Sequence, residues 1–441
     1  MIGAGVAGLA AARDVTAAGL TVEVLEARRR IGGRVLTVRD PSISMPVELG
    51  AEFVHGAAAE IRSVARDAGL TICDVHGDRW ESMRRGLRPL EDFWEQLDLV
   101  MSRLDAKRQP DRSFADFLAA RPGGRSLSRQ RRLASQWVRG FHAADPSRAS
   151  ERALAGGGSP GDDESEQRQA RVLEGYDRIP AYLARELKRE PRLGTIVASV
   201  GWSRGAVELT LRADAGSSLP PLSARAVIVT APLGVLQAPP SADGSITFTP
   251  PLPATKVEAL RGLAQGHVVR VGVVLDEPVW VTTPSRTIGG GASLHRLAFI
   301  HPGDDEMPVC WTAYPTDAPL LIAWYGGPDA QALGDLPRRE IEARAIAALA
   351  RRLHVSRRRL ERHVVSCHTH NWSADPFSRG AYSYVVVDGE KASVALARPV
   401  AGTLFFAGEA FDAEGRNGTV HGAIASGRAV ARQVVRALRA R

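Results

Sequence analysis

Three glycines at the start of the chain have the spacing of a phosphate-binding loop. Gly3, Gly5 and Gly8 make the pattern G-x-G-x-x-G within the segment MIGAGVAGLAAARD. In such a loop the first glycine allows a tight turn, the second lets the backbone approach a pyrophosphate, and the third lets a helix pack closely on a strand. Because glycines are common at helix starts, this pattern alone is weak evidence for a dinucleotide site.

Glu26 strengthens the dinucleotide interpretation. It lies 21 residues after Gly5, at the end of the expected strand TVEVLE over residues 21–26. A carboxylate at that place can accept hydrogen bonds from the hydroxyl groups of an adenosine ribose. Together with a helix expected over residues 4–19, this strand begins a βαβ unit. The alternative is an exposed acidic residue at a strand end.

A strand should precede the glycine loop, but only Met1 and Ile2 do so. The first strand of such a parallel sheet carries several buried aliphatic side chains, each worth roughly 1.5–3 kcal/mol. Loss of four would remove roughly 6–12 kcal/mol, which is comparable with the net stability of a whole domain. We therefore expect that Met1 is an internal methionine or a misassigned start, and that the chain as printed binds its nucleotide poorly.

The composition is that of a globular protein with room for two or three domains. Of 441 residues, 44% are hydrophobic and 24% are charged, and no apolar run approaches the roughly 20 residues that cross a bilayer. The net charge of +8 comes mostly from scattered arginines, so neither nucleic acid nor a membrane is an expected partner. The three cysteines give no disulfide framework or zinc spacing, which favours a reducing compartment, the cytoplasm, and no metal site. An export signal would lie in the missing segment.

The order of the expected elements indicates an α/β fold. Residues 58–190 are expected to be mainly helical, with a polar glycine-rich loop at residues 156–167. Residues 193–245 are expected to be β-rich, with a strand pair around the turn WSRG and then the apolar strand ARAVIVTAP, which suits a sheet buried on both faces. The strand TLFFAG and an amphipathic helix beginning near Thr419 end the chain.

Several blocks of sequence resemble those of the flavin-dependent amine oxidases. This family includes monoamine oxidases, polyamine oxidases and the flavin-dependent histone lysine demethylases. The run VLEARRRIGGRV resembles its second FAD signature, and LFFAGEAFDAEGRNGTVHGAIASGRA resembles its closing FAD block. The intervening runs VELGAEFVHG, APLGVLQ, ITFTPPLP and NWSADPFSRGAYSYV look like further blocks in family order.

The resemblance implies a Rossmann-like FAD-binding domain with a truncated first strand, and a discontinuous α+β substrate-binding domain. The FAD-binding domain would comprise residues 1–57, 190–245 and 376–441, and the substrate-binding domain residues 58–189 and 246–375. The residues that the family pattern places around FAD are Gly3, Gly5, Val6, Ala7, Gly8, Glu26, Ala27, Arg28, Gly33, Arg34, Gly50, Ala51, Glu52, Val197, Gly408, Glu409, Thr419 and Val420.

Four of these residues have a specific role in the resemblance. Arg34 offers a fork of donors to the diphosphate, next to the backbone N–H groups of the first helix. Glu409 follows the strand TLFFAG, and the family places this acid on the ribityl chain; the alternative is an unrelated loop acid. Val197 pairs its backbone with the adenine. The helix beginning near Thr419 directs its N-terminus at the isoalloxazine and stabilises negative charge there.

Two residues depart from the family pattern. Members that tether the flavin have a cysteine before the tyrosine of the block SRGAYSY, whereas this chain has Ala381, so we expect non-covalent FAD. Where most relatives have a lysine that holds a water near flavin N5, this chain has Arg270. Arginine can hold a water but cannot relay a proton as lysine can. We expect Arg270 to slow reoxidation by oxygen or to favour another electron acceptor; the alternative is a shifted alignment that leaves Arg270 on the surface.

The resemblance also implies which residues form the site of amine oxidation. Tyr382 and Trp372 match positions along the flavin face, with Tyr382 on one side of an aromatic cage; the alternative for an isolated aromatic residue is the core. Thr419 stands where monoamine oxidases have a second tyrosine, which is more like the polyamine oxidase and demethylase branch. His55 matches a histidine of the polyamine-oxidising branch, and its near-neutral titration would suit a substrate ammonium; the alternative is a structural histidine. His421 is expected to be structural.

We therefore expect FAD-dependent oxidation of a primary or secondary amine by hydride transfer to flavin N5. Reoxidation by oxygen would give hydrogen peroxide, and the imine would hydrolyse to an aldehyde or ketone. The partners are then a small amine and oxygen, and the protein is a monomer or a homodimer. The residues that position the reactants are Arg270, Tyr382, Trp372, His55 and Thr419. The alternatives are an amino-acid oxidase or desaturase of the same fold, a nicotinamide dehydrogenase, and a flavin-binding interaction protein that has lost catalysis.

Overall fold

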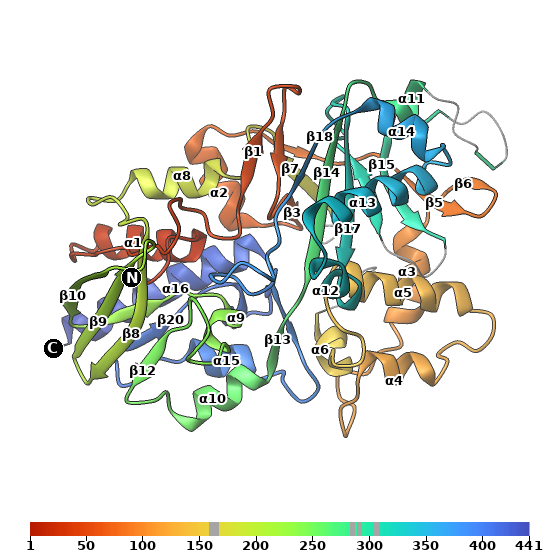
Figure 1. Ribbon diagram of the computed structural model, residues 1–441. Helices are drawn as coiled ribbons and strands as arrows, with labels where there is room; N and C mark the ends of the chain where they lie inside the picture. The colour runs from red at the N-terminus through yellow and green to blue at the C-terminus, as the bar shows by residue number, and fades with distance from the viewer. Residues whose placement is uncertain (158–166, 283–286, 289–292, 304–307, 441) are drawn as a thin grey trace.

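The structure has two halves that are joined by several crossings of the chain (Figure 1). It is a computed structural model, and it describes residues 1–157, 167–282, 287–288, 293–303 and 308–440. One half contains both chain termini, the helices α1 (Val6–Ala17) and α16 (Val420–Arg439), and a small parallel sheet. The other half contains a seven-stranded sheet with helices on both of its sides. The architecture is therefore mixed α/β.

Short parallel strands form the centre of the first half. Strand β11 (Val227–Val229) pairs in parallel with β20 (Leu404–Phe406). On the other side of β11, Ile2 forms parallel bridges to Val229 and to Leu25, and Leu25 forms one to Arg192. The expected strand over residues 21–26 is therefore reduced to one bridging residue, Leu25, which pairs with Ile2 on one side and with Arg192 on the other. The truncation of the first strand stays a prediction.

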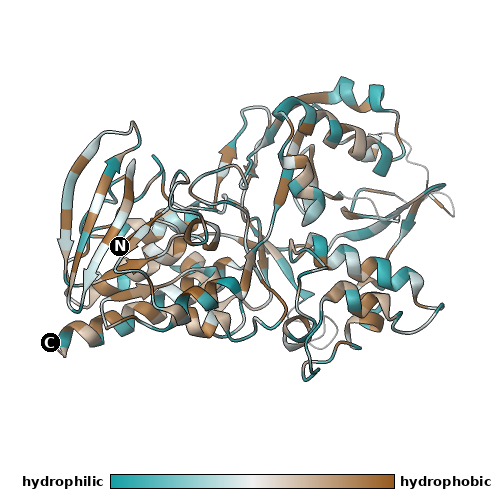
Figure 2. Ribbon diagram, turned by 60° about the horizontal axis from the view of Figure 1, so that its bottom comes forward, coloured by the Kyte–Doolittle hydropathy of each residue, from teal (hydrophilic) through white to brown (hydrophobic). Residues whose placement is uncertain are grey.

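This parallel sheet is buried on both faces, as the apolar run in β11 predicts. Ile228 and Phe405 pack in the core that contains α1 and α16. The alternate residues, Val227, Val229 and Phe406, pack in a second core with the mixed sheet of order β10-β9-β8-β12, in which only β12 and β8 pair in parallel. The strands of that sheet are β8 (Thr195–Ser203), β9 (Ala206–Ala213), β10 (Ser218–Ala224) and β12 (Thr247–Thr249). Figure 2 shows the alternation of apolar and polar residues along its strands.

The two ends of the chain meet where α1 packs against α16. A Cβ atom at Gly427 would collide with the carbonyl oxygen of Ala7, so only glycine permits this close approach. Ile424, Ala431 and Val434 of α16 are buried in the same core. The helices that complete this half are α2 (Ala59–Ala68), α8 (Arg178–Arg185), α9 (Leu233–Leu236), α10 (Ala254–Arg261) and α15 (Ala392–Ala397).

The seven-stranded sheet has the order β18-β14-β17-β16-β15-β5-β6. Its strands are β5 (Asp78–Met83), β6 (Gly86–Pro89), β14 (Val268–Leu275), β15 (Leu297–Pro302), β16 (Val309–Thr312), β17 (Leu320–Gly326) and β18 (Val364–Thr369). Helix α13 (Arg338–Arg352) packs against β14, β17 and β18, and α5 (Ser128–Gly140) contacts β17. The other helices of this half are α3 (Phe93–Met101), α4 (Phe114–Ala119), α6 (Glu151–Gly156), α11 (Val279–Thr282), α12 (Pro328–Gly334) and α14 (Arg357–His363).

The expectation of a mainly helical segment over residues 58–190 is wrong in part. Besides the described helices α2 to α6 and α8, the segment contains β4 (Ile72–Asp74), β5, β6 and β7 (Gln169–Val172). These strands are short, and local periodicity does not reveal them. β5 and β6 form a hairpin, whereas β5 also pairs with the distant β15 and β7 with the distant β3 (Phe53–His55). Of the predicted loop at residues 156–167, residues 158–166 lie outside the described residues.

The remaining elements are short. They are β1 (Thr37–Arg39), β2 (Pro46–Glu48), β13 (Leu263–Gln265), β19 (Ser383–Val385) and the 3₁₀ helix η1 (Glu409–Phe411). Among the described residues, no helix combines the length and the apolar character that a membrane crossing requires.

Candidate active site

A cavity of about 860 Å³ lies between the two halves, and residues from both ends of the chain line it. Its walls come from the start of α1, the segment after β2, strand β8, the loop before α16, and the second half of the molecule. A cavity of this size lies in the range of small-molecule and cofactor sites. The arrangement brings segments more than 300 residues apart to one site, as in the Arg34–Glu409 contact, which spans 375 residues.

The glycine loop forms one end of this cavity. Gly3 has a φ of +101°, and a Cβ atom there would lie 2.5 Å from Thr230 Oγ1. A Cβ atom at Gly8 would collide with the carbonyl oxygen of Gly3, which explains why the third glycine is needed for helix packing. Gly5 caps α1 without a side-chain hydrogen bond and lines the cavity. The first N–H groups of α1 are therefore placed to bind an anionic group, such as a pyrophosphate.

Glu26 lies at the edge of the glycine loop and is buried. Its Oε2 accepts a hydrogen bond of 2.7 Å from Ala4 N, and its Oε1 accepts one of 2.9 Å from Arg28 N. The Arg28 side chain in turn donates to Asp375 Oδ1 at 2.7 Å and to Ser378 Oγ at 2.8 Å. The carboxylate thus holds the loop in place and also lines the cavity. Its predicted contact with a ribose stays a prediction.

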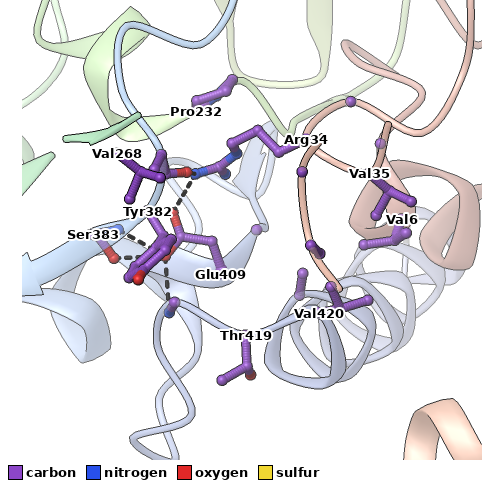
Figure 3. Close-up of a pocket in the computed structure, with 18 of the residues that line it drawn as sticks. Val6, Arg34, Val35, Pro232, Val268, Tyr382, Ser383, Glu409, Thr419 and Val420 are labelled. Atoms are coloured by element: carbon purple, nitrogen blue, oxygen red, sulfur yellow. Dashed lines mark hydrogen bonds and ion pairs between the residues drawn. The ribbon is translucent and has the colours of Figure 1, made fainter. Parts of the chain in front are cut away.

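Arg34 and Glu409 form an ion pair inside the cavity (Figure 3). Arg34 Nη1 lies 2.8 Å from Glu409 Oε1 and also donates to the carbonyl oxygen of Ala381 at 2.6 Å. Glu409 Oε2 accepts hydrogen bonds from Ser383 Oγ at 2.6 Å and from Gly418 N at 3.0 Å. Each oxygen of this buried carboxylate therefore has a donor, and the pair links the run VLEARRRIGGRV to the run LFFAGEAF near the end of the chain.

The start of α16 and two aromatic side chains form the adjoining wall. Thr419 caps α16, because its Oγ1 accepts a hydrogen bond of 3.0 Å from Gly422 N. Tyr382 lies next to this turn and donates its hydroxyl to the carbonyl oxygen of Phe141 at 2.7 Å. Trp372 is buried and donates its Nε1 to the carbonyl oxygen of Leu49 at 2.8 Å. The hydrogen bonds fix both rings at the cavity wall.

Glu52 is held between two buried arginines. Its Oε2 lies 2.8 Å from Arg270 Nη2 and accepts a hydrogen bond of 3.0 Å from Trp311 Nε1, and its Oε1 contacts Arg171 Nη1. Burial lowers the pKa of Arg171 and of Arg270 to about 9, so both stay charged near neutral pH. Glu52 and Trp311 line the cavity, whereas Arg270 does not. Arg270 thus reaches the cavity wall through Glu52.

The comparisons with known proteins agree with this geometry. A family model described as flavin containing amine oxidoreductase matches residues 6–435. The chain belongs to the flavin-containing amine oxidoreductase family. The probable polyamine oxidase 4 of Arabidopsis thaliana is 26% identical over 97% of this chain and 84% of its own length. A putrescine oxidase solved with putrescine bound and the cyclohexylamine oxidase of Brevibacterium oxydans IH-35A each match 99% of this chain and 98% of their own, with a TM-score of 0.78 and identities of 21% and 20%.

As a member of this family, the protein is an oxidoreductase that uses a flavin to oxidise amines. All predicted cofactor residues except Gly8 line the cavity, and so do all predicted catalytic residues except Arg270. Gly8 lies behind the loop, as its role in helix packing requires. Arg270 is buried, so the alternative of a surface position is excluded. The individual contacts with the flavin and the amine stay predictions.

The expected near-neutral titration of His55 in this amine oxidoreductase is wrong. His55 lines the cavity, but burial, with smaller contributions from His421 and Arg79, lowers its pKa to about 4. Its ring packs edge-on against Phe141, with the ring centroids 5.1 Å apart. A neutral imidazole cannot repel a substrate ammonium, so His55 remains compatible with an amine in the cavity.

The sequence patterns missed the part of the cavity that lies in the second half. The phenylalanine and tryptophan residues in its described wall are Phe53, Phe93, Trp137, Phe141, Phe299, Trp311 and Trp324. Arg79, His142 and His301 also line the cavity. These residues come from different strands and helices and share no motif, so only the folded chain brings them together. The two arginines that pair with Glu52 are likewise far from it in the chain: Arg171 is 119 residues away, and Arg270 lies still farther along.

Proposed function

We propose that the protein binds FAD non-covalently in this cavity and oxidises a primary or secondary amine. The observation that carries the proposal is the family match over residues 6–435, together with a cavity that both ends of the chain enclose. The colliding Cβ positions of the glycine loop and the start of α1, where the N-cap Gly5 offers no side-chain acceptor, fit a pyrophosphate. The parallel order of Arg192, Leu25, Ile2 and Val229 supports a Rossmann-like arrangement for the FAD-binding domain.

The absence of a nearby thiol supports the non-covalent form. Ala381 stands at the position where tethered relatives have a cysteine, and it lines the cavity. Cys73, Cys310 and Cys367 are free, and none of them is among the described residues of the cavity wall. Denaturation of the holoenzyme should therefore release all of its FAD.

The flavin, when bound, would accept a hydride from the α-carbon of the amine and pass two electrons to oxygen, giving hydrogen peroxide. The protein residues around it position the reactants and exclude water. Tyr382 and Trp372 are fixed by hydrogen bonds and offer an apolar wall to the amine. The N-terminus of α16 and Arg34 supply positive potential near the cofactor. The imine product hydrolyses to an aldehyde or ketone.

Arg270 would influence the oxidative half of the reaction through Glu52. It is held by Glu52 Oε2 at 2.8 Å and by the carbonyl oxygen of Gly50 at 3.4 Å, and both of these residues line the cavity. A charged arginine in this position cannot relay a proton, which supports slow reoxidation by oxygen or the use of another acceptor. The domain boundaries, the monomeric or dimeric state and the cytoplasmic location stay predictions.

Anaerobic reduction of the bound flavin by a panel of amines tests the proposed function. We expect at least one class among monoamines, polyamines and amino-substituted acids to bleach the flavin absorbance of the holoenzyme. Bleaching by none of them would contradict the proposal and would favour a flavin-binding protein without catalysis. Bleaching by polyenes only would indicate a desaturase of the same fold.

A further inference from the structure

Arg79 places a guanidinium in the wall of the cavity, among aromatic rings. It lies on strand β5 in the second half of the molecule and lines the cavity. Its Cζ atom is 4.4 Å from the ring centroid of Phe299 and 4.9 Å from that of Phe93. Its Nη2 donates to Gln169 Oε1 at 3.1 Å, and its Nη1 lies 3.4 Å from His301 Nε2. All of these neighbours are uncharged side chains.

No carboxylate balances this cation within the part of the chain that the structure describes. Burial alone lowers the pKa of Arg79 to about 10, and no acidic neighbour opposes that shift. The group therefore stays positively charged near neutral pH. His301 cannot compensate, because burial and then the charge of Arg79 hold its pKa well below the usual value. A buried charge without a counter-ion is costly, and an anionic ligand would remove that cost.

The carboxylates in the described cavity wall are already engaged. Glu26 accepts hydrogen bonds from two backbone N–H groups, and Glu52 is held by two arginines. Glu409 pairs with Arg34, and Glu60 lies 2.9 Å from Arg416 Nη1. A second ammonium group on a substrate would thus compete with the cations that already hold these carboxylates. An anionic group would instead meet Arg79, which has no carboxylate partner among the described residues.

We propose that Arg79 binds a carboxylate at the tail of the amine substrate, so that the enzyme prefers amino-carboxylates to diamines. This inference rests on the proposed amine oxidation and names its substrate class. Phe299, whose ring centroid is 6.1 Å from that of Trp311, connects Arg79 to the Glu52 side of the cavity. The rings offer an apolar surface for a spacer between the two ends of the substrate. The carboxylate is therefore separated from the reacting carbon, as in an ω-amino acid, and takes no part in the redox step.

Three substrates of equal length test the preference directly. These are 6-aminohexanoate, hexylamine and 1,6-diaminohexane, with 4-aminobutanoate and 8-aminooctanoate to vary the spacer. For the wild-type holoenzyme we expect kcat/KM to be at least roughly 10-fold higher for an ω-amino-carboxylate than for the diamine of equal length. A preference for the diamine would overturn the inference. So would a preference for 2-aminohexanoate, whose carboxylate lies on the reacting carbon.

Substitutions of Arg79 then test whether it carries the preference. Arg79→Gln should lower kcat/KM for the preferred amino-carboxylate roughly 100-fold, mainly by raising KM. The kcat/KM for hexylamine should change by less than about threefold. Arg79→Lys keeps the charge and should restore part of the loss. Arg85→Gln removes the same charge from an exposed position in the turn after β5, and it should leave kcat/KM unchanged for both substrates. Equal losses for all substrates in Arg79→Gln, without recovery in Arg79→Lys, would indicate a structural role only.

Binding of an unreactive acid separates this inference from the proposed function. Hexanoate has the carboxylate but no amine, and calorimetry can follow its binding to the holoenzyme without turnover. We expect binding to wild type and to Arg85→Gln, and a roughly 10-fold or greater loss in Arg79→Gln. Equal hexanoate affinity in all three proteins would overturn the role of Arg79. If no amine bleaches the flavin but hexanoate binding depends on Arg79, the proposed function fails while the anion site stands.

Discussion

Arg34 Nη1 lies 2.8 Å from Glu409 Oε1, although 375 residues separate the two in the chain. The pair is largely buried, with side-chain exposures of 23% and 6%, and it lies in the wall of the large cavity. It therefore closes the chain on itself in the wall of the cavity in which we propose that the flavin binds. Each residue is also the counter-ion of the other in the protein without a cofactor.

Replacement of Glu409 should weaken both the fold and the flavin site. In Glu409→Gln, Arg34 loses its buried counter-ion, so we expect a loss of about 3 kcal/mol in the free energy of unfolding and roughly 10-fold weaker FAD binding. Glu414→Gln is the control, because Glu414 pairs with Arg416 but is 75% exposed; it should change stability by less than about 0.5 kcal/mol. Denaturant unfolding and FAD titration measure the two effects. Equal stability of the two variants would contradict the account of this pair.

Close packing of α1 against α16 should depend on the absence of a side chain at Gly427. Gly427→Ala places a Cβ atom against the carbonyl oxygen of Ala7, and we expect a loss of about 1–3 kcal/mol because the helices must separate. Gly156→Ala is the matched control, since a Cβ atom there meets nothing within 4 Å; it should be neutral or slightly stabilising. Thermal unfolding of both variants measures the difference, and a neutral Gly427→Ala would show that the helices are not tightly packed.

Glu48 should make stability fall as the pH rises. Burial raises its pKa to about 7, against hydrogen bonds from Thr37 and Tyr176, so the folded protein favours the protonated form. Between pH 5 and 8 the wild type must ionise this group, and stability therefore decreases relative to Glu48→Gln by up to about 3 kcal/mol. Comparison of the two proteins isolates Glu48, because the buried histidines contribute to both. A pH-independent difference in unfolding free energy would contradict the raised pKa.

Arg270 should control how fast the reduced enzyme reacts with oxygen. We expect Arg270→Lys to speed reoxidation at least roughly 10-fold, because lysine can relay a proton that arginine retains. Arg296→Lys is the control, with a side chain that is 62% exposed near β15. Stopped-flow mixing of the reduced holoenzymes with oxygen measures the rates. Equal rates for wild type and Arg270→Lys would remove this explanation.

The sequence was most informative where local spacing carries the structure. The glycine loop could be predicted because a turn before a helix requires glycine at fixed positions. Glu26 followed from its distance to that loop, and the closing block from its resemblance to a family pattern. These residues do line the cavity or support it. The pairing of Arg34 with Glu409 could not be predicted, because it depends on how two distant segments fold together. The same reason hid the pairs of Glu52 with Arg171 and Arg270.

Short strands and environment-dependent charges were the least predictable features. Strands β5 and β7 contain charged residues, Asp78 and Arg171 among them, and each pairs with a distant part of the chain, β5 with β15 and β7 with β3 and β4. The titration of His55 was wrong because burial, which sequence does not give, lowers its pKa to about 4. Arg79 carries no motif at all, and its meaning appears only when its uncharged neighbours are known.

The central claim is that one flavin is held where the two ends of the chain meet. Titration of FAD into the purified protein, followed by absorbance and calorimetry, tests it most directly. The account predicts one FAD bound per chain, weaker binding in Glu409→Gln, and release of intact FAD on denaturation. A full-length, folded protein that stays colourless and shows no affinity for FAD would contradict it.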